Sequence, residues 1–394
     1  MSVRLVVVTE IISPYRIPVF NALARLPEID LHVMFLAKTD SSMRQWRVYT
    51  DEIQFSYEVL PSWRQRIGKH NLLLNKHVTR ALRQANPEVI LCGGYNYLAS
   101  WQALRWAKRN AVPFLLWCES TAGDRRNLYR IVEGVKRTFL NDCSGFVVPG
   151  KSASEYVRQL AGSDDIFVAP NAVDTKLFSA QCEAAQIRAP RLRGDLGLPD
   201  RYFLYVGRLV PEKGLSDLLQ AYANLDSQLR SEVGLVIAGD GPIRAEMEAA
   251  AQSNFPGNVH FAGFVERDQL ASYYSLAECL VLPTHTDTWG MVVNEAMACG
   301  LPIICTDVAG CAADLVSSNG ILVGVSKISE LSDAMRDIAT DPELRNRMSA
   351  ESRRLIQGYS PQHCAEGIAK AAFAAVPRGN NYQRQLENHA VSTL

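Results

Sequence analysis

Short apolar strands alternate with amphipathic helices along the chain, and this alternation restricts the possible folds more than any other feature. In the first half, the runs that predict strands are Arg4–Thr9, Leu31–Leu36, Val89–Cys92, Phe114–Trp117, Gly145–Val148 and Ile166–Ala169. Helical spacing falls between them at Pro18–Arg25, Leu72–Gln84, Leu98–Arg109 and Lys151–Leu160. Because strands that alternate with helices pair in parallel, we predict a parallel sheet with helices on both faces.

The second half repeats this alternation from Tyr202 to Val325. Further helices are predicted at Ile328–Thr340, Pro342–Ile356 and about Pro361–Ala375. A chain of 394 residues with 47% hydrophobic content is long enough for two domains that each bury a core. We therefore predict an α/β protein with two Rossmann-like, doubly wound parallel-sheet domains, joined by a linker at Arg188–Pro199.

Two carboxylates flank a predicted helix start in the stretch Leu282–Pro302. Asp287 lies in a turn after an apolar strand, and Glu295 lies about one turn inside the following helix, facing the same crevice. One carboxylate could hold the hydroxyls of a sugar and the other those of a ribose. Taken alone, the pair also fits a solvated helix cap and a surface charge. Free backbone N–H groups at the helix start suit a phosphate oxygen between the two acids; they belong to Gly290, Met291 and Val292.

A second motif, Tyr202–Gly214, places two cations after an apolar strand. Arg208 follows the strand and Lys213 precedes the next helix, so both lie at the carboxyl end of a predicted parallel strand. Arg208 offers a planar fork and Lys213 a mobile point charge, which together can clamp a diphosphate. The alternatives are that Lys213 is a solvated turn residue and that Arg208 pairs with Glu212.

In order and spacing, these two motifs and the segments Gly239–Pro242 and Val259–Gly263 resemble the donor-binding domain of the family 4 (group 1) retaining glycosyltransferases, which have the GT-B fold. The resemblance extends over most of the chain and is sharpest from Tyr202 to Asp307. It implies two Rossmann-like domains that face a central cleft, with the active site at the carboxyl ends of both sheets.

The resemblance also implies a role for each motif residue. Arg208 and Lys213 would bind the diphosphate, Asp287 would contact the transferred sugar, and Glu295 would bind the ribose. The family usually has Glu at the first acidic position, so Asp287 keeps the charge but shortens the reach by one methylene. The donor-binding set is completed by Asp240, Gly241, Phe264, Val265, Trp289, Gly290, Met291 and Val292.

The base and the sugar of the donor stay open. Main-chain contacts around Phe264 and Val265 would select the base, and groups near His285 and Trp289 would select the hexose, so UDP- and GDP-linked sugars both fit. No Asp-x-Asp motif is present. Because fixed cations and the helix start could neutralise the leaving diphosphate, we expect neither a metal nor another cofactor.

The first half is expected to supply the acceptor side of the cleft. Many family members have a glycine pair after the first strand, but this chain has Tyr15 and Arg16, a loop similar to that of bacterial members that build surface polysaccharides. Both side chains could contact the acceptor or the phosphate, although Arg16 could instead only cap the sheet. Tyr95 and Asn96 follow another strand end and could line the same site.

Glu119 follows the predicted strand Phe114–Trp117 and is the nearest match to the polar residue, often His, that approaches the reacting sugar in this family. We therefore include it among the catalytic candidates, with Asp287, Lys213 and Arg208. The alternative is that Glu119 pairs with Arg125 or Arg126.

The resemblance implies a retaining transfer of a hexose from a nucleoside-diphosphate sugar to a glycan or lipid-linked acceptor, in cell-surface polysaccharide or glycolipid synthesis. Residues 1–185 would bind the acceptor, with a helix at about 361–376 packing back on them; residues 186–358 would bind the donor; and residues 379–394 would form a polar tail. An epimerase or phosphorylase of the same fold and a non-catalytic binding protein stay as alternatives. A dinucleotide oxidoreductase is disfavoured because no Gly-x-Gly-x-x-Gly turn follows the first strand.

The net charge of zero hides an asymmetry between the halves. Residues 1–175 hold 22 Lys and Arg against 16 Asp and Glu, and the remaining residues hold 19 against 25. The basic surplus gathers at Arg44–His70, with Trp46 and Trp63, and on a predicted helical face with Arg126, Arg130 and Arg137. Such a surface suits anionic lipid head groups or an acidic acceptor, although solvated helix faces look much the same. No feature indicates nucleic-acid binding.

Nine cysteines, mostly in apolar contexts and without zinc-ligand spacing, predict buried thiols in a reducing cytoplasm. We see neither a secretory signal at the start nor an apolar run long enough to span a bilayer. The expected location is the cytoplasm, with a possible peripheral contact at the inner face of the cell membrane.

Overall fold

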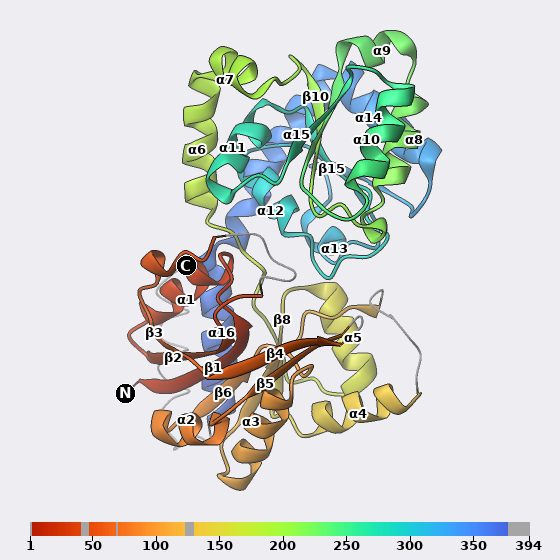
Figure 1. Ribbon diagram of the computed structural model, residues 1–394. Coiled ribbons are helices and arrows are strands. Elements are labelled where there is room, and N and C mark those ends of the chain that lie inside the picture. Colours follow the sequence, from red (N-terminus) through yellow and green to blue (C-terminus); the bar gives the residue numbers. More distant parts are fainter. Residues whose placement is uncertain (1, 41–46, 68–69, 123–129, 377–394) are drawn as a thin grey trace.

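The computed structural model describes residues 2–40, 47–67, 70–122 and 130–376, which form two parallel sheets with helices on both faces (Figure 1). The first sheet has seven strands, in the order β3 (Ser56–Val59), β2 (Ile29–Ala37), β1 (Val3–Ile11), β6 (Val89–Cys92), β7 (Phe114–Trp117), β8 (Gly145–Val148) and β9 (Ile166–Val168). Side chains alternate between its two faces, since Leu5 and Val7 of β1 enter one core cluster while Val6 and Val8 enter the other.

Helices cover both faces of this first sheet. The last helix returns from the second domain and packs against α1, β7, β8 and β9, so that Cys364 and Ile368 complete the core of the first sheet. The helices of this domain are α1 (Arg16–Ala24), α2 (Val78–Ala85), α3 (Leu98–Arg109), α4 (Arg130–Asn141), α5 (Lys151–Ala161) and α16 (Pro361–Ala375), with a short 3-10 turn, η1 (Thr50–Glu52).

The second sheet has six parallel strands, in the order β12 (Val259–Gly263), β11 (Gly234–Ala238), β10 (Tyr202–Val206), β13 (Cys279–Leu282), β14 (Ile303–Thr306) and β15 (Gly320–Val323). Its helices are α6 (Thr175–Ile187), α7 (Ala189–Leu196), α8 (Leu215–Ala223), α9 (Ser227–Glu232), α10 (Arg244–Asn254), α11 (Arg267–Leu276), α12 (Met291–Ala298), α13 (Ala312–Leu315), α14 (Ile328–Thr340) and α15 (Pro342–Leu355), with 3-10 turns η3 (Pro211–Lys213) and η4 (Ile356–Tyr359). Helices α12 and α13 lie on the side of this domain that faces the first (Figure 1).

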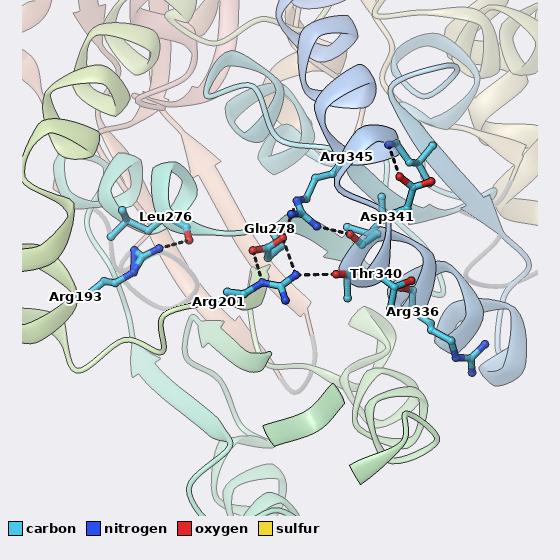
Figure 2. Close-up of polar contacts among 11 residues, drawn as sticks. Arg193, Arg201, Leu276, Glu278, Arg336, Thr340, Asp341 and Arg345 are labelled. Atoms are coloured by element: carbon cyan, nitrogen blue, oxygen red, sulfur yellow. Dashed lines mark hydrogen bonds and ion pairs between the residues drawn. The ribbon is translucent and has the colours of Figure 1, made fainter. Parts of the chain in front are cut away.

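A charged cluster ties the amino ends of β10 and β13 to the helices behind them. Glu278, which precedes β13, accepts from Arg201 Nε at 2.9 Å and faces Arg345 Nε of α15 at 2.8 Å (Figure 2). The Glu278 side chain is only 13% exposed, so removing one partner would leave a poorly solvated charge. This cluster holds the end of the sheet opposite to the carboxyl-end loops.

Three sequence predictions about local structure are wrong. The predicted helix Leu72–Gln84 is a strand followed by a shorter helix: β5 (His70–Asn75) pairs antiparallel with β4 (Ser62–Ile67), and α2 begins only at Val78. Leu73 is buried while Leu72 is 39% exposed, which is the alternation of a strand. The predicted linker Arg188–Pro199 contains α7, which has a proline in its first turn and ends at Gly197 with a left-handed φ of 62°.

The third error concerns the cysteines. Cys182 of α6 and Cys299, directly after α12, form a disulfide, so the prediction that all nine are thiols is wrong for this pair. Both residues are buried in the core cluster of the second domain, where α6 packs on α12. Sequence separation of 117 residues concealed the pairing, because only the fold brings the two helices together.

Candidate active site

The candidate site begins where the loops after β10, β11 and β13 meet. The Leu209 N–H donates to the Asp240 carbonyl at 2.9 Å, and the His285 N–H donates to the Glu212 carbonyl at 2.9 Å. These backbone bonds hold the loops of three strands against one another at the carboxyl edge of the sheet. Side chains from segments far apart in the sequence are thereby fixed in one place.

Lys213 and Asp287 form an ion pair at this junction. Lys213 Nζ contacts Oδ2 of Asp287, and the Trp289 N–H donates to the other oxygen, Oδ1, at 3.3 Å. The two side chains are only 15% and 17% exposed. They are therefore neither a solvated turn residue nor a surface charge, which were the alternatives that the sequence allowed.

The remaining diphosphate candidates lie around this pair. Arg208 is exposed and has no ion pair, with Glu212 or otherwise, among the residues that the structure describes. Asp240 Oδ1 accepts from the Gly241 N–H at 2.8 Å and lies 3.9 Å from Arg244 Nη1. Beyond them, the Phe264 side chain is 42% exposed, whereas Val265 is buried in the core.

Helix α12 begins next to Asp287. Gly290 precedes it with a φ of 96°, and Met291 and Val292 in its first turn are half-buried. The Trp289 side chain is 3% exposed and donates from Nε1 to Asn294 Oδ1 at 2.8 Å. The indole belongs to the core cluster of the second domain, and a donor contact of Trp289 stays a prediction.

Glu295 is enclosed rather than open to the cleft, which corrects the expectation that it faces a crevice. It is 0% exposed, and Tyr274 of α11 donates to its Oε2 at 2.6 Å. Burial raises the pKa of the Glu295 carboxyl to about 7, while hydrogen bonds from Tyr274 and Tyr15 and the charge of Arg267 act in the opposite direction. Tyr15 comes from the first domain, so both domains contribute to this carboxylate.

A pocket of about 290 Å³ lies between the domains on the acceptor side. It is lined by the carboxyl ends of β1, β6 and β7, and by Thr288 of the second domain. Of the predicted acceptor-side residues, Arg16, Tyr95 and Asn96 line it together with the catalytic candidate Glu119, whereas Tyr15 interacts with Glu295 instead.

Arg16, which lines this pocket, is held by three contacts. Its guanidinium lies 3.8 Å above the centre of the Trp117 ring, its Nη2 pairs with Glu119, and its Nη1 donates to Asn171 Oδ1 at 3.3 Å. Glu119 therefore pairs with Arg16, and Arg125 and Arg126 lie outside the described residues. Neither Trp117 nor Asn171 was a sequence candidate.

Comparison with known proteins gives one assignment for both halves of the chain. Residues 21–177 match the family described as Glycosyltransferase Family 4, and residues 190–355 match the family described as Glycosyl transferases group 1. The chain belongs to the family 4 (group 1) glycosyltransferases. The second matched range contains the carboxylates Asp287 and Glu295, which have seven residues between them, and the basic pair Arg208 and Lys213.

Curated relatives match this family member over part of their length. An alpha-D-kanosaminyltransferase of Streptomyces kanamyceticus is 35% identical over 184 residues, which are 45% of this chain and 47% of that protein. A D-inositol 3-phosphate glycosyltransferase of Arthrobacter sp. (strain FB24) is 28% identical over 259 residues, 63% of this chain and 58% of that protein. The match thus spans about half the length of these relatives.

Solved structures confirm the predicted GT-B fold. Anabaena Alr3699/HepE, in complex with UDP, superposes with a TM-score of 0.76 over 94% of this chain and 100% of that chain, at 17% identity. A sucrose-phosphate synthase from Thermosynechococcus elongatus gives a TM-score of 0.72 over 93% and 98%, at 20% identity.

Two further contacts join the domains of this glycosyltransferase family member. Arg267 of α11 pairs with Glu52 and lies 3.8 Å above the centre of the Tyr49 ring. Asp314 of α13 accepts from the backbone N–H of Lys151, at the start of α5, at 3.0 Å. This helix start is therefore occupied by a carboxylate from the other domain.

The described residues contain no group of three or more His, Cys, Asp or Glu side chains that could hold a metal ion. No helix among them is long and apolar enough to cross a membrane. Of the predicted basic surface, Arg44, Trp46 and Arg126 lie outside the described residues, while Trp63 on the β4–β5 hairpin is 52% exposed.

Gly214→Ala should damage this site more than a matched glycine change elsewhere in the domain. Gly214 has a φ of 68°, and a Cβ there would lie 1.9 Å from the Pro283 carbonyl oxygen, so the loops of Lys213 and Asp287 would be forced apart. Gly197 has a φ of 62° but its nearest neighbour would lie 3.9 Å away. We expect Gly197→Ala to cost about 1–2 kcal/mol, from backbone strain alone, and Gly214→Ala to cost clearly more.

Thermal unfolding and turnover measurements check this prediction. Each kcal/mol corresponds to roughly 2–4 °C for a domain of this size, so the two variants should be resolved easily. Gly214→Ala should also lower turnover, and Gly197→Ala should not. Equal losses of stability, with normal turnover in both, would contradict the close approach of the loops.

The enclosed Glu295 predicts a pH-dependent stability. Because its pKa in the folded state is about 7 and its ordinary value is 4.5, the folded state binds the proton more tightly. Proton binding by Glu295 therefore adds to the free energy of unfolding below pH 4.5. This stabilisation, of the order of 3 kcal/mol, is lost as the pH rises through 7. Glu295→Gln should therefore become more stable relative to wild type between pH 5 and 8. Denaturant titration at both pH values measures this difference, with Glu246→Gln, at an exposed position on α10, as the control.

Proposed function

We propose that this protein transfers a hexose from a nucleoside-diphosphate sugar to an acceptor hydroxyl, with retention of configuration at the anomeric carbon. The observation that carries the proposal is the Lys213–Asp287 pair, which the loops of two neighbouring strands hold at the start of α12, next to Thr288 of the acceptor-side pocket. This arrangement supplies a cation for a leaving diphosphate and a carboxylate for a sugar hydroxyl.

The chemistry follows from the charges that develop during transfer. As the bond between the anomeric carbon and the phosphate oxygen breaks, the sugar gains oxocarbenium character and the diphosphate gains negative charge. Lys213, Arg208 and the backbone N–H groups at the start of α12 would stabilise the leaving diphosphate. The acceptor oxygen would attack from the same face, and the departing phosphate oxygen would take the acceptor's proton.

For the donor, we propose a UDP-linked hexose ahead of a GDP-linked one. Support comes from Alr3699/HepE, the solved neighbour of the same fold that is bound to UDP. Phe264 is 42% exposed in the loop after β12, and this loop would meet the base. The ribose would be bound by Glu295, which requires the Tyr15 contact to give way.

For the acceptor, we propose a glycan or lipid-linked sugar bound by residues 1–185 and by the helix at about 361–376, with residues 186–358 binding the donor. The exposed Trp63 and Leu72 on the β4–β5 hairpin support a peripheral contact with an anionic membrane surface. The proposed setting is cell-surface polysaccharide or glycolipid synthesis on the cytoplasmic side.

A thermal-shift panel of nucleoside diphosphates, followed by product analysis with the matching nucleotide sugars, tests the proposal. A ligand at about one hundred times its dissociation constant adds roughly 2.7 kcal/mol of stability, so UDP should shift unfolding and GDP should not. Transfer or slow donor hydrolysis supports the transferase. Epimerisation without acceptor would indicate a different enzyme of the same fold, and binding without turnover would indicate a non-catalytic protein.

A further inference from the structure

The charge of the acceptor-side pocket carries an inference about the acceptor, and it rests on the proposed transferase function. Of the described side chains that line the pocket, three are charged: Glu10, Arg16 and Glu119. This described lining therefore has a formal charge of −1. Behind the lining, Arg64 forms ion pairs both with Glu10, at 3.5 Å, and with Asp40. Because Arg64 and Asp40 cancel each other, they leave the charge of the described lining at −1.

Arg16, the one cation among the described lining residues, is already engaged. Arg16 uses one terminal nitrogen for Glu119 and the other for Asn171, while Trp117 covers a face of its guanidinium. Recognition of a phosphate by arginine normally uses a free planar fork. An incoming phosphate would have to displace Glu119 and would still meet the charge of Glu10.

The two carboxylates flank the pocket. Glu10 is the last residue but one of β1 and Glu119 follows β7, and β6 lies between these strands in the sheet. Neighbouring strands are about 4.8 Å apart, so the two strand ends are roughly 10 Å apart, which is enough for one sugar ring. The volume of about 290 Å³ agrees with one ring. Because Thr288 also lines the pocket, a ring held there lies beside Asp287 and the donor.

We propose that the pocket selects its acceptor by charge: the ring that enters it is an unphosphorylated polyol, and a ring that carries an ammonium group is preferred to its neutral counterpart. Glu10 and Glu119 are the specificity-determining residues. Any phosphate on a larger acceptor lies outside the pocket. The same two carboxylates attract an ammonium group and repel a phosphate, so both preferences have one origin.

Matched acceptors that differ only in charge test the proposal. Glucose, glucosamine and glucose 6-phosphate form one set, and inositol, an aminocyclitol and an inositol phosphate form another. The ratios of kcat/KM within each set are compared for wild type, Glu10→Gln, Glu119→Gln and the double variant, whose linings carry charges of −1, 0, 0 and +1. Each lost carboxylate should raise the phosphorylated-to-amino ratio about tenfold, and Glu246→Gln, on the outside of the other domain, should leave it unchanged.

The possible results separate the acceptor inference from the proposed function. Wild type that prefers the phosphorylated ring would overturn the inference while transfer itself stands. Ratios that stay constant across the four proteins would remove the specificity role of Glu10 and Glu119. If wild type binds UDP but neither transfers to any acceptor nor hydrolyses the donor, the proposed function fails and the inference fails with it.

Discussion

Replacing Lys213 by alanine is expected to lower the turnover number by about 10²–10³-fold, the usual effect of removing one preorganised group that stabilises developing charge. Lys213 is the enclosed cation beside Asp287, and its side chain is only 15% exposed. Without it, the leaving diphosphate keeps only Arg208, which is exposed, and the helix start. Steady-state kinetics with the nucleotide sugar that responds in the binding panel measures the loss.

The matched control for this change is Lys176→Ala. Lys176 lies on α6 in the same domain and is exposed, so its removal should leave turnover within twofold of wild type. Circular dichroism and unfolding curves establish that Lys213→Ala is folded. A folded variant that turns over at nearly the normal rate would show that the ion pair is structural and would sink the assignment of Lys213 to the diphosphate.

Asp287→Asn should lower turnover about a hundredfold while changing the affinity for the nucleoside diphosphate less than about threefold. The carboxylate faces the transferred sugar in our proposal, so its charge matters when the sugar becomes cationic and matters little for the nucleotide alone. Lowered turnover with retained nucleotide binding would therefore show that Asp287 acts on the sugar and not on the diphosphate. Calorimetric binding of UDP alongside steady-state kinetics gives both quantities.

Asp287→Glu is the matched variant, because it restores the length usual in the family and keeps the charge. We expect it to be more active than Asp287→Asn and to change the relative use of different hexoses. Equal losses of turnover and of nucleotide affinity in Asp287→Asn would point to a mainly structural role, through the Lys213 pair and the Trp289 N–H.

The buried strands were predictable because a parallel strand is apolar on both sides. The predicted bounds of Val89–Cys92, Phe114–Trp117 and Gly145–Val148 agree with the structure to the residue. The meeting of Lys213 and Asp287, which are 74 positions apart, was also predictable, since both follow strands whose carboxyl ends share one edge. The prediction failed for the β4–β5 hairpin, because the short run of three leucines, Leu72–Leu74, resembles an apolar helix segment.

Contacts between the two domains could not be predicted from the sequence. The sequence offered a pair with Arg125 or Arg126 as the alternative to a catalytic role for Glu119, but its partner in the structure is Arg16, 103 positions away. The enclosure of Glu295 depends on Tyr15 from the other domain and on Tyr274, whose spacing carries no signal of its own. Trp117 and Glu10 could have been found by applying the strand-end rule to every strand of the first sheet, since both stand at such ends. Asn171 lies on the segment between β9 and α6, to which this rule does not apply.

The return of α16 to the first sheet has a consequence for biosynthesis. The first domain is translated first, yet Cys364, Ala365 and Ile368 belong to its core. At about 5–20 residues per second, the ribosome needs roughly 10–40 s to make the 200 or so residues between β9 and this helix. During that interval one apolar face of the first sheet lacks α16, whereas the second domain receives its last strand, β15, and the helices α14 and α15 before α16 is made. The domain that is made second is therefore the one that can complete its core first, and a ribosome pause before residue 361 would prolong the exposure of the other.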